Sequence, residues 1–145
     1  MNTIQIEHIL QRHLPNFLGV YARNRLPRVL KEGSFCLIAN TDPDNENGQH
    51  WIAIYVDEYA KGEYYDPFGF PPIHKAFENF LNDRCSRWIY NGVLVQHPFS
   101  TACGQHCIFY LIQRNRGLQM HDVTRFLSKD LHANTSFVDK FMKTL

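Results

Sequence analysis

The stretch that most constrains this chain runs from Gln96 to Cys107 and reads QHPFSTACGQHC. A helix over residues 102–115 is predicted from the apolar positions that recur along one side of it: Cys107, Ile108, Leu111 and Ile112. Cys103 stands at the start of that helix. The positive end of a helix dipole favours thiolate over thiol, and the thiolate is the form that attacks carbonyl groups. The sequence therefore predicts a reactive cysteine at position 103. We expect the rest of the fold to position other catalytic side chains next to it.

A cysteine nucleophile needs a base and usually a third group that orients the base. His50 begins a predicted strand over residues 50–56, and Asp66 ends the next one, over residues 63–66. If these strands pair antiparallel around the turn at 57–62, the two side chains lie at the same end of the sheet. We therefore expect His50 to be the base and Asp66 to accept its N–H. The structural alternatives are a surface histidine and an Asp-Pro turn.

Two neighbours of these residues fit the same chemistry. The side-chain amide of Gln96 can join the backbone N–H of Cys103 as a donor to the oxyanion, and such a donor contributes about 3 kcal/mol. Trp51 follows His50 and can shield the pair from water or contact substrate. A solvated glutamine and simple core packing of the tryptophan are the alternatives.

The 145 residues suit a single domain, 1–145, and a hydrophobic fraction of 44% suffices for one packed core. Residues 16–33 are expected to form a loop, and 40–49 a polar loop. Helices are predicted over residues 3–14 (with Thr3 as N-cap), 73–82, 102–115, 121–128 and 135–143 (capped by Asn134 or Thr135). Strands are predicted over residues 35–39, 50–56, 63–66, 87–90 and 93–96, the last two joined at Asn91-Gly92 as a hairpin. Because strands cluster rather than alternate with helices, the expected class is α+β, with a small antiparallel sheet packed against helices.

A metal site competes for the same helix. Cys103, His106 and Cys107 lie within about one turn, and zinc would take a further ligand from Cys36 or Cys85. No second ligand pair stands at a recognisable spacing. We therefore favour catalysis and expect no metal, with Cys107 in the core.

Charge and hydropathy exclude several classes of protein. The net charge is +1, which gives no general attraction to nucleic acid, and no stretch has the length of a membrane span. The N-terminus lacks the basic region and the cleavage site of a secretory signal. We therefore expect a reducing compartment and four free thiols.

Four blocks of sequence, in this order, closely resemble the adenain family of adenovirus proteases: His50-Trp51, residues 65–70 (YDPFGF), Val95-Gln96 and residues 102–104 (ACG). The SUMO- and ubiquitin-like-protein proteases are more distantly similar. The resemblance implies a papain-like architecture in permuted chain order, with Cys103 as nucleophile, His50 as base and acid, Asp66 as orienter and Gln96 as oxyanion donor. Adenain carries Glu at the position of Asp66, whereas the distant relatives carry Asp.

The resemblance also implies partners. Viral members of the family cleave capsid and core precursors, commonly after glycine, inside the assembling particle, which places the protein in the virion or host nucleus. They are activated by a disulfide-linked peptide and by DNA. Residues 83–85 (DRC) resemble the segment that holds the linking cysteine, so Cys85 is the expected attachment point; an ordinary free thiol is the alternative. Because the net charge is only +1, activation by DNA has less support than activation by a peptide.

The leading hypothesis is thus a monomeric cysteine endopeptidase of viral or virus-like origin. One alternative is a protease that removes ubiquitin-like modifiers. Another is a non-catalytic module that binds nucleic acid or capsid protein.

Overall fold

The computed structural model describes residues 1–28, 33–45, 50–127 and 129–145. A five-stranded sheet forms its centre, with the strands in chain order β1-β2-β3-β4-β5. The strands are β1 (Phe17–Ala22), β2 (Phe35–Asn40), β3 (Trp51–Val56), β4 (Lys61–Tyr65) and β5 (Arg87–Tyr90). The three central strands are antiparallel, whereas β1 pairs parallel to β2 and β5 parallel to β4. The α+β class is confirmed, and the sheet is mixed because its two outer strands run parallel to their neighbours.

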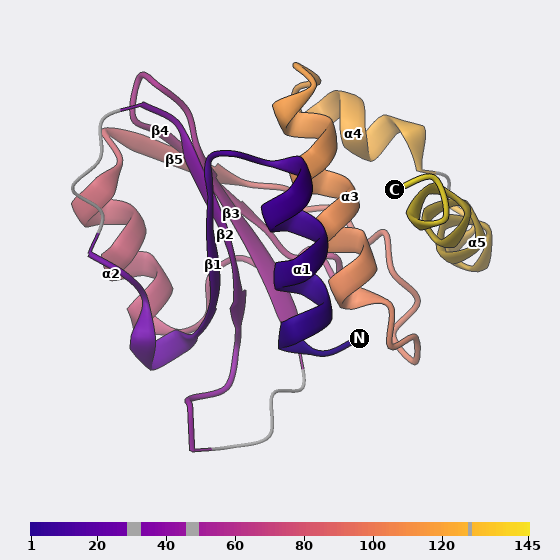
Figure 1. Cartoon of the computed structure of the whole chain (residues 1–145), viewed down its shortest axis with the longest axis horizontal. Helices are drawn as coiled ribbons and strands as arrows, with labels where there is room; N and C mark the ends of the chain where they lie inside the picture. Colours follow the sequence, from indigo (N-terminus) through magenta and orange to yellow (C-terminus); the bar gives the residue numbers. More distant parts are fainter. Residues whose placement is uncertain (29–32, 46–49, 128) are drawn as a thin grey trace.

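Helices cover both faces of the sheet (Figure 1). On one side lies α2 (Lys75–Arg84); on the other lie α1 (Thr3–His13) and α3 (Cys103–Asn115), with α4 (Met120–Phe126) and α5 (Leu131–Met142) outside α3. A short 3-10 turn, η1 (Arg23–Arg25), follows β1. No helix in the described part of the chain is long and apolar enough to cross a membrane.

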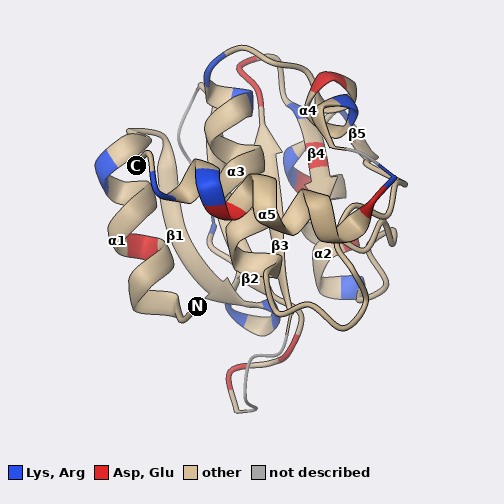
Figure 2. Cartoon of the chain, turned by 90° about the vertical axis from the view of Figure 1, so that its right-hand side faces the viewer, with Lys and Arg blue, Asp and Glu red and all other residues tan. Residues whose placement is uncertain are grey.

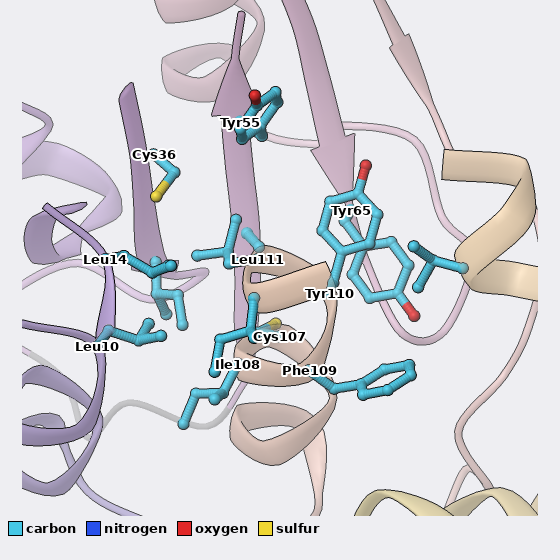
Figure 3. Close-up of a cluster of buried hydrophobic side chains, with 14 of the residues drawn as sticks. Leu10, Leu14, Cys36, Tyr55, Tyr65, Cys107, Ile108, Phe109, Tyr110 and Leu111 are labelled. Carbon is cyan, nitrogen blue, oxygen red and sulfur yellow. The ribbon is translucent and has the colours of Figure 1, made fainter. Parts of the chain in front are cut away.

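The larger core lies between the sheet and α1, α3, α4 and α5. In Figure 3, Ile108 and Leu111 of α3 lie toward Leu10 and Leu14 of α1, and Cys107 belongs to the same core. Cys107, Ile108 and Leu111 are among the apolar positions whose 3.6-residue period predicted the helix over residues 102–115. A second core, beneath α2, contains the other faces of β2, β3 and β4. Both faces of the three central strands are therefore buried, which holds their ends in fixed positions.

Several helix boundaries differ from the sequence predictions by a few residues. Asn2, not Thr3, caps α1 through a hydrogen bond that its side chain accepts from Gln5. Asp130 caps α5, so that helix begins four residues before the predicted start. The predicted helix 73–82 begins at Lys75 instead. The last residue of the predicted helix 121–128 and residues 46–49 of the predicted polar loop lie outside the described residues.

Two strand predictions were wrong. Residues 17–22, expected in a loop, form β1, because the parallel pairing with β2 supplies hydrogen bonds that no local pattern reveals. Residues 93–96 form no strand, so the predicted hairpin is absent. Gly92 does adopt a turn conformation, with φ of +63°. The chain then leaves the sheet, and β5 pairs with β4 alone.

Candidate active site

The predicted nucleophile, Cys103, is the first residue of α3 and is buried, with 6% of its surface exposed. The helix begins after Ala102, which makes no side-chain cap. Its first N–H groups therefore remain available near the sulfur. One turn further on, Cys107 donates its S–H to the backbone oxygen of Trp51 over 3.4 Å and ties α3 to β3. The helix start is thus fixed against the strand that follows His50.

His50 and Asp66 meet as the strand pairing predicts. His50 immediately precedes β3 and Asp66 immediately follows β4, and the pairing of Ala53 with Tyr65 brings the two ends together. Nε2 of His50 lies 2.7 Å from Oδ1 of Asp66. Asp66 is buried, at 4% exposure, so this contact is shielded from solvent. Because Nε2 is engaged by the carboxylate, Nδ1 is the ring nitrogen left to face Cys103.

The electrostatics of the site favour a thiolate–imidazolium pair. Burial lowers the pKa of His50, but its hydrogen bonds with Asp66 and Cys103 outweigh burial and raise that pKa to about 9. Burial raises the pKa of Cys103, but the hydrogen bond from His50 and backbone hydrogen bonds from Trp51 and Gly104 outweigh it, so the thiol pKa falls below its ordinary value. Both shifts stabilise charges of opposite sign side by side at neutral pH.

The ring of Phe68 is a part of the site that the sequence did not identify. It stacks on the imidazole of His50 with ring centres 4.6 Å apart and planes 12° apart. The backbone N–H of Phe68 also donates to Oδ1 of Asp66 over 2.8 Å. Phe68 therefore restrains both partners, and its aromatic face favours the charged form of the ring. The PFGF block drew attention to this residue only through its resemblance to a family.

Gln96 is fully buried, in the segment that leads to α3. Its Nε2 donates to the backbone oxygen of Ser100 over 2.9 Å, while Oε1 has no partner among the described residues. No hydrogen bond joins Gln96 to Cys103 in this part of the chain. An amide nitrogen carries two hydrogens, so one N–H of Gln96 remains after the bond to Ser100.

Trp51 is half-buried and lies against the head of α3. A Cβ placed on Gly104 would come within 3.4 Å of the Trp51 ring, so glycine allows the ring to approach the residue next to Cys103. Trp51 also lines a cleft of about 210 Å³ between the ends of β1 and β2 and Thr3. Trp51 thus borders both the head of α3 and this cleft.

The remaining predicted residues lie apart from this site or take no part in it. Cys85 ends α2, beside Gly62 of β4, and half-burial raises the pKa of its thiol to about 11. All four cysteines are free. The described residues contain no group of three or more potential metal ligands, and His106 is buried with neither ring nitrogen bonded.

Comparisons with known proteins agree with one another. A sequence model of the adenovirus endoprotease family matches residues 17–124. The protease of porcine adenovirus A serotype 3 is 31% identical over 114 residues, covering 68% of this chain and 55% of that protein. The protease of bovine adenovirus 2 is 35% identical over 112 residues, covering 67% and 54%. The chain therefore spans about half the length of the curated relatives it matches.

Among solved structures, the ASFV pS273R protease has a similar fold. The TM-score is 0.65 at 16% sequence identity, and the match covers 85% of this chain and 61% of that one. At this identity the likeness concerns the fold. It agrees with an α+β arrangement in which a helix begins beside the ends of two antiparallel strands.

Proposed function

Because the chain belongs to the adenovirus endoprotease family, we propose that it is a cysteine endopeptidase with Cys103 as nucleophile and His50 as base and acid. The observation that carries the proposal is the arrangement of Asp66, His50 and Cys103 at the head of α3, in which Oδ1 of Asp66 lies 2.7 Å from Nε2 of His50 and His50 interacts with the Cys103 thiol. The family match supports the reaction class, and the geometry supports a role for each group.

In the proposed mechanism, the Cys103 thiolate attacks the carbonyl carbon of the scissile bond. The oxyanion that forms accepts hydrogen bonds from the backbone N–H of Cys103 and the free N–H of Gln96. The His50 imidazolium then gives its proton to the leaving amine, and an acyl-enzyme remains. His50 next takes a proton from water as the water attacks the thioester, which releases the acid and restores the Cys103 thiolate beside the His50 imidazolium. Asp66 stays ionised and holds the ring in place.

This proposal predicts that Cys103→Ala and His50→Ala each reduce peptide cleavage by about 10⁴-fold or more. The substrate is a short peptide with glycine before the scissile bond, and circular dichroism checks the fold. His121→Ala is the matched control, because the side chain of that histidine is 72% exposed and is paired with Asp122 at the surface. Cleavage at the wild-type rate by either site variant would contradict the proposal.

We propose capsid or core precursors as the substrates, since viral relatives of this family cleave them in the assembling particle or host nucleus. Trp51 and the cleft beside it, which has both apolar and polar lining residues, offer a surface for part of a peptide substrate. A preference for short glycine-containing peptides over a folded modifier ending in Gly-Gly supports this substrate class. The opposite preference would indicate a deconjugating protease, and a Cys103 that iodoacetamide does not alkylate would indicate a binding module.

We also propose an activating peptide that forms a disulfide with Cys85. The thiol lies just before β5, an edge strand with Ile89 and Tyr90 exposed at 56% and 43%. An extended peptide can add to such an unpaired edge through backbone hydrogen bonds. Because burial raises the pKa of Cys85 to about 11, we expect slow disulfide formation at neutral pH.

Cleavage rates with a cysteine-containing peptide, measured for the wild type and Cys85→Ser, test this attachment. Activation that is equal in both proteins would overturn it.

DNA is the second activator implied by the family. Figure 2 shows basic and acidic segments interspersed over the face it presents, which gives DNA little electrostatic support. Fluorescence anisotropy with labelled duplex DNA at two salt concentrations measures that binding directly.

A further inference from the structure

Asp66 is held by a side chain outside the catalytic series. Asn91 donates from Nδ2 to the backbone oxygen of Asp66 over 2.7 Å and accepts from the backbone N–H of Asp66 at Oδ1 over 3.1 Å. The planar side-chain amide therefore pairs with one residue through a donor and an acceptor at once, as a backbone peptide group does in a sheet. Nδ2 also donates to the oxygen of Val93 over 3.1 Å, which fixes the amide plane.

This contact stands where the β4–β5 ladder ends. The last paired residues are Tyr64 and Tyr90, and Gly92, with φ of +63°, turns the chain out of the sheet directly after Asn91. Asp66 would otherwise have no strand partner on that side. The Asn91 side chain thus takes the place of a strand partner for the backbone N–H and oxygen of Asp66.

The bonds around Asp66 leave its backbone little freedom. Its oxygen also accepts from the N–H of Gly69 over 2.7 Å, and Oδ1 accepts from the N–H of Phe68 over 2.8 Å. With backbone and carboxylate both fixed, Oδ1 lies 2.7 Å from Nε2 of His50.

We propose that Asn91 is a positioning residue that holds the Asp66 carboxylate in line with His50. The inference rests on the proposed function. Asn91 bonds to the backbone N–H and oxygen of Asp66 and, within the described part of the chain, makes no hydrogen bond to the imidazole, so it acts through the orientation of the carboxylate. A displacement of about 1 Å at such a distance from the chemistry costs about 100-fold in rate. Removing the amide is therefore expected to lower kcat by about 10- to 100-fold with little change in KM.

The test compares Asn91→Ala and the similarly shaped Asn91→Leu with the wild type. Asn82→Ala is the matched control, because Asn82 accepts one hydrogen bond, from the Trp88 ring, and has no hydrogen bond to Asp66. Two measurements are made: kcat and KM for a peptide, and the pH dependence of Cys103 alkylation by iodoacetamide, with the modified cysteine identified by mass spectrometry. If the alanine and leucine variants do not fold, Asn91→Asp, which keeps the acceptor for the Asp66 N–H, is measured in the same way.

Misalignment of Asp66 predicts that the upper pKa of the alkylation profile, about 9 in the wild type, falls toward the ordinary histidine value in the Asn91 variants only. A lower melting temperature with an unchanged alkylation profile would show a merely structural role and overturn the proposal, as would a wild-type kcat. The alkylation profile can be measured even if the wild type cleaves no peptide. Failure of the proposed function is thereby distinguished from failure of this inference.

Discussion

At the scale of single residues, the imidazole of His50 is restrained on three sides. Asp66 holds one ring nitrogen at 2.7 Å, Phe68 covers a ring face, and Cys103 occupies the remaining direction. A ring held in this way cannot rotate to an unproductive orientation without breaking a buried hydrogen bond. In the proposed mechanism, this restraint keeps the proton that the ring carries close to the leaving amine.

The first prediction concerns the pH dependence of cleavage. The pKa of Cys103 is lowered and that of His50 is raised to about 9, so the thiolate–imidazolium pair exists between the two values. Activity should rise from acid pH as the thiol ionises and fall as pH passes through about 9, where the imidazolium loses its proton. Measuring kcat/KM against pH checks this. A profile that keeps rising beyond pH 10 would mean that the imidazolium is not required.

The two strand-end residues could be predicted from sequence because an antiparallel pair joined by a short turn brings the ends of its strands together. Asn91 and Phe68 could not. Asn91 stands in an Asn-Gly pair, which usually signals a hairpin, and its contact with Asp66 exists only because β5 lies parallel to β4. Phe68 acts through ring stacking, which no spacing in the sequence encodes.

At the scale of elements, a buried ion pair joins β4 to α3. Arg114 donates to both carboxylate oxygens of Glu63, over 2.7 and 2.8 Å, and Tyr110 donates to the same carboxylate. The Arg114 side chain also lies 4.5 Å over the ring of Tyr55 in β3. Two charges with several partners each are therefore held at the end of α3 away from Cys103, which fixes the helix at both ends.

The second prediction follows from the burial of this pair, whose side chains are 7% and 11% exposed. Glu63→Gln or Arg114→Met leaves one buried charge without its partner, which should lower the free energy of unfolding by about 3–5 kcal/mol. Urea unfolding gives the value. Glu78→Gln, in an exposed pair with Lys75, should have no measurable effect. An equal, small effect at both sites would show that Glu63 and Arg114 are hydrated.

Elements were predictable where the pattern was local. The 102–115 helix and the three central strands followed from periodicity and from polar turns between them. The strand at residues 87–90, β5, was also predicted, but its parallel pairing with β4 was not, and β1 was missed because it depends on a parallel partner, β2, that is distant in sequence. Gly19, at φ +145°, lies where the register between β1 and β2 shifts, between Phe17 and Val20, so the strand is irregular at that point.

At the scale of the whole molecule, His106 links stability to pH. It is fully buried in α3 without a hydrogen-bond partner among the described residues, and burial lowers its pKa to about 4. The unfolded chain binds a proton at this residue near its ordinary value of 6.5 and the folded chain does not. Stability should therefore be fully present above pH 6.5 and be lost progressively as pH falls to about 4.

The third prediction is that His106→Phe flattens this acid-side loss. The urea midpoint of the variant should change less than that of the wild type between pH 7 and pH 4, because no buried group then gains a proton only on unfolding. His121→Phe serves as control, since this histidine lies at the surface with 72% of its side chain exposed. Equal slopes in the wild type and His106→Phe would place the acid sensitivity elsewhere.

The order of the strands in the sheet follows their order in the chain, and this has a consequence for when the molecule becomes active. During synthesis, the β3–β4 pair can form and unite His50 with Asp66 before α3 has left the ribosome. Cys103 arrives later and meets them only when α3 docks on β3. The emerging chain thus carries the His50–Asp66 pair before Cys103 is in place, so the proposed catalytic group is complete only once α3 has docked.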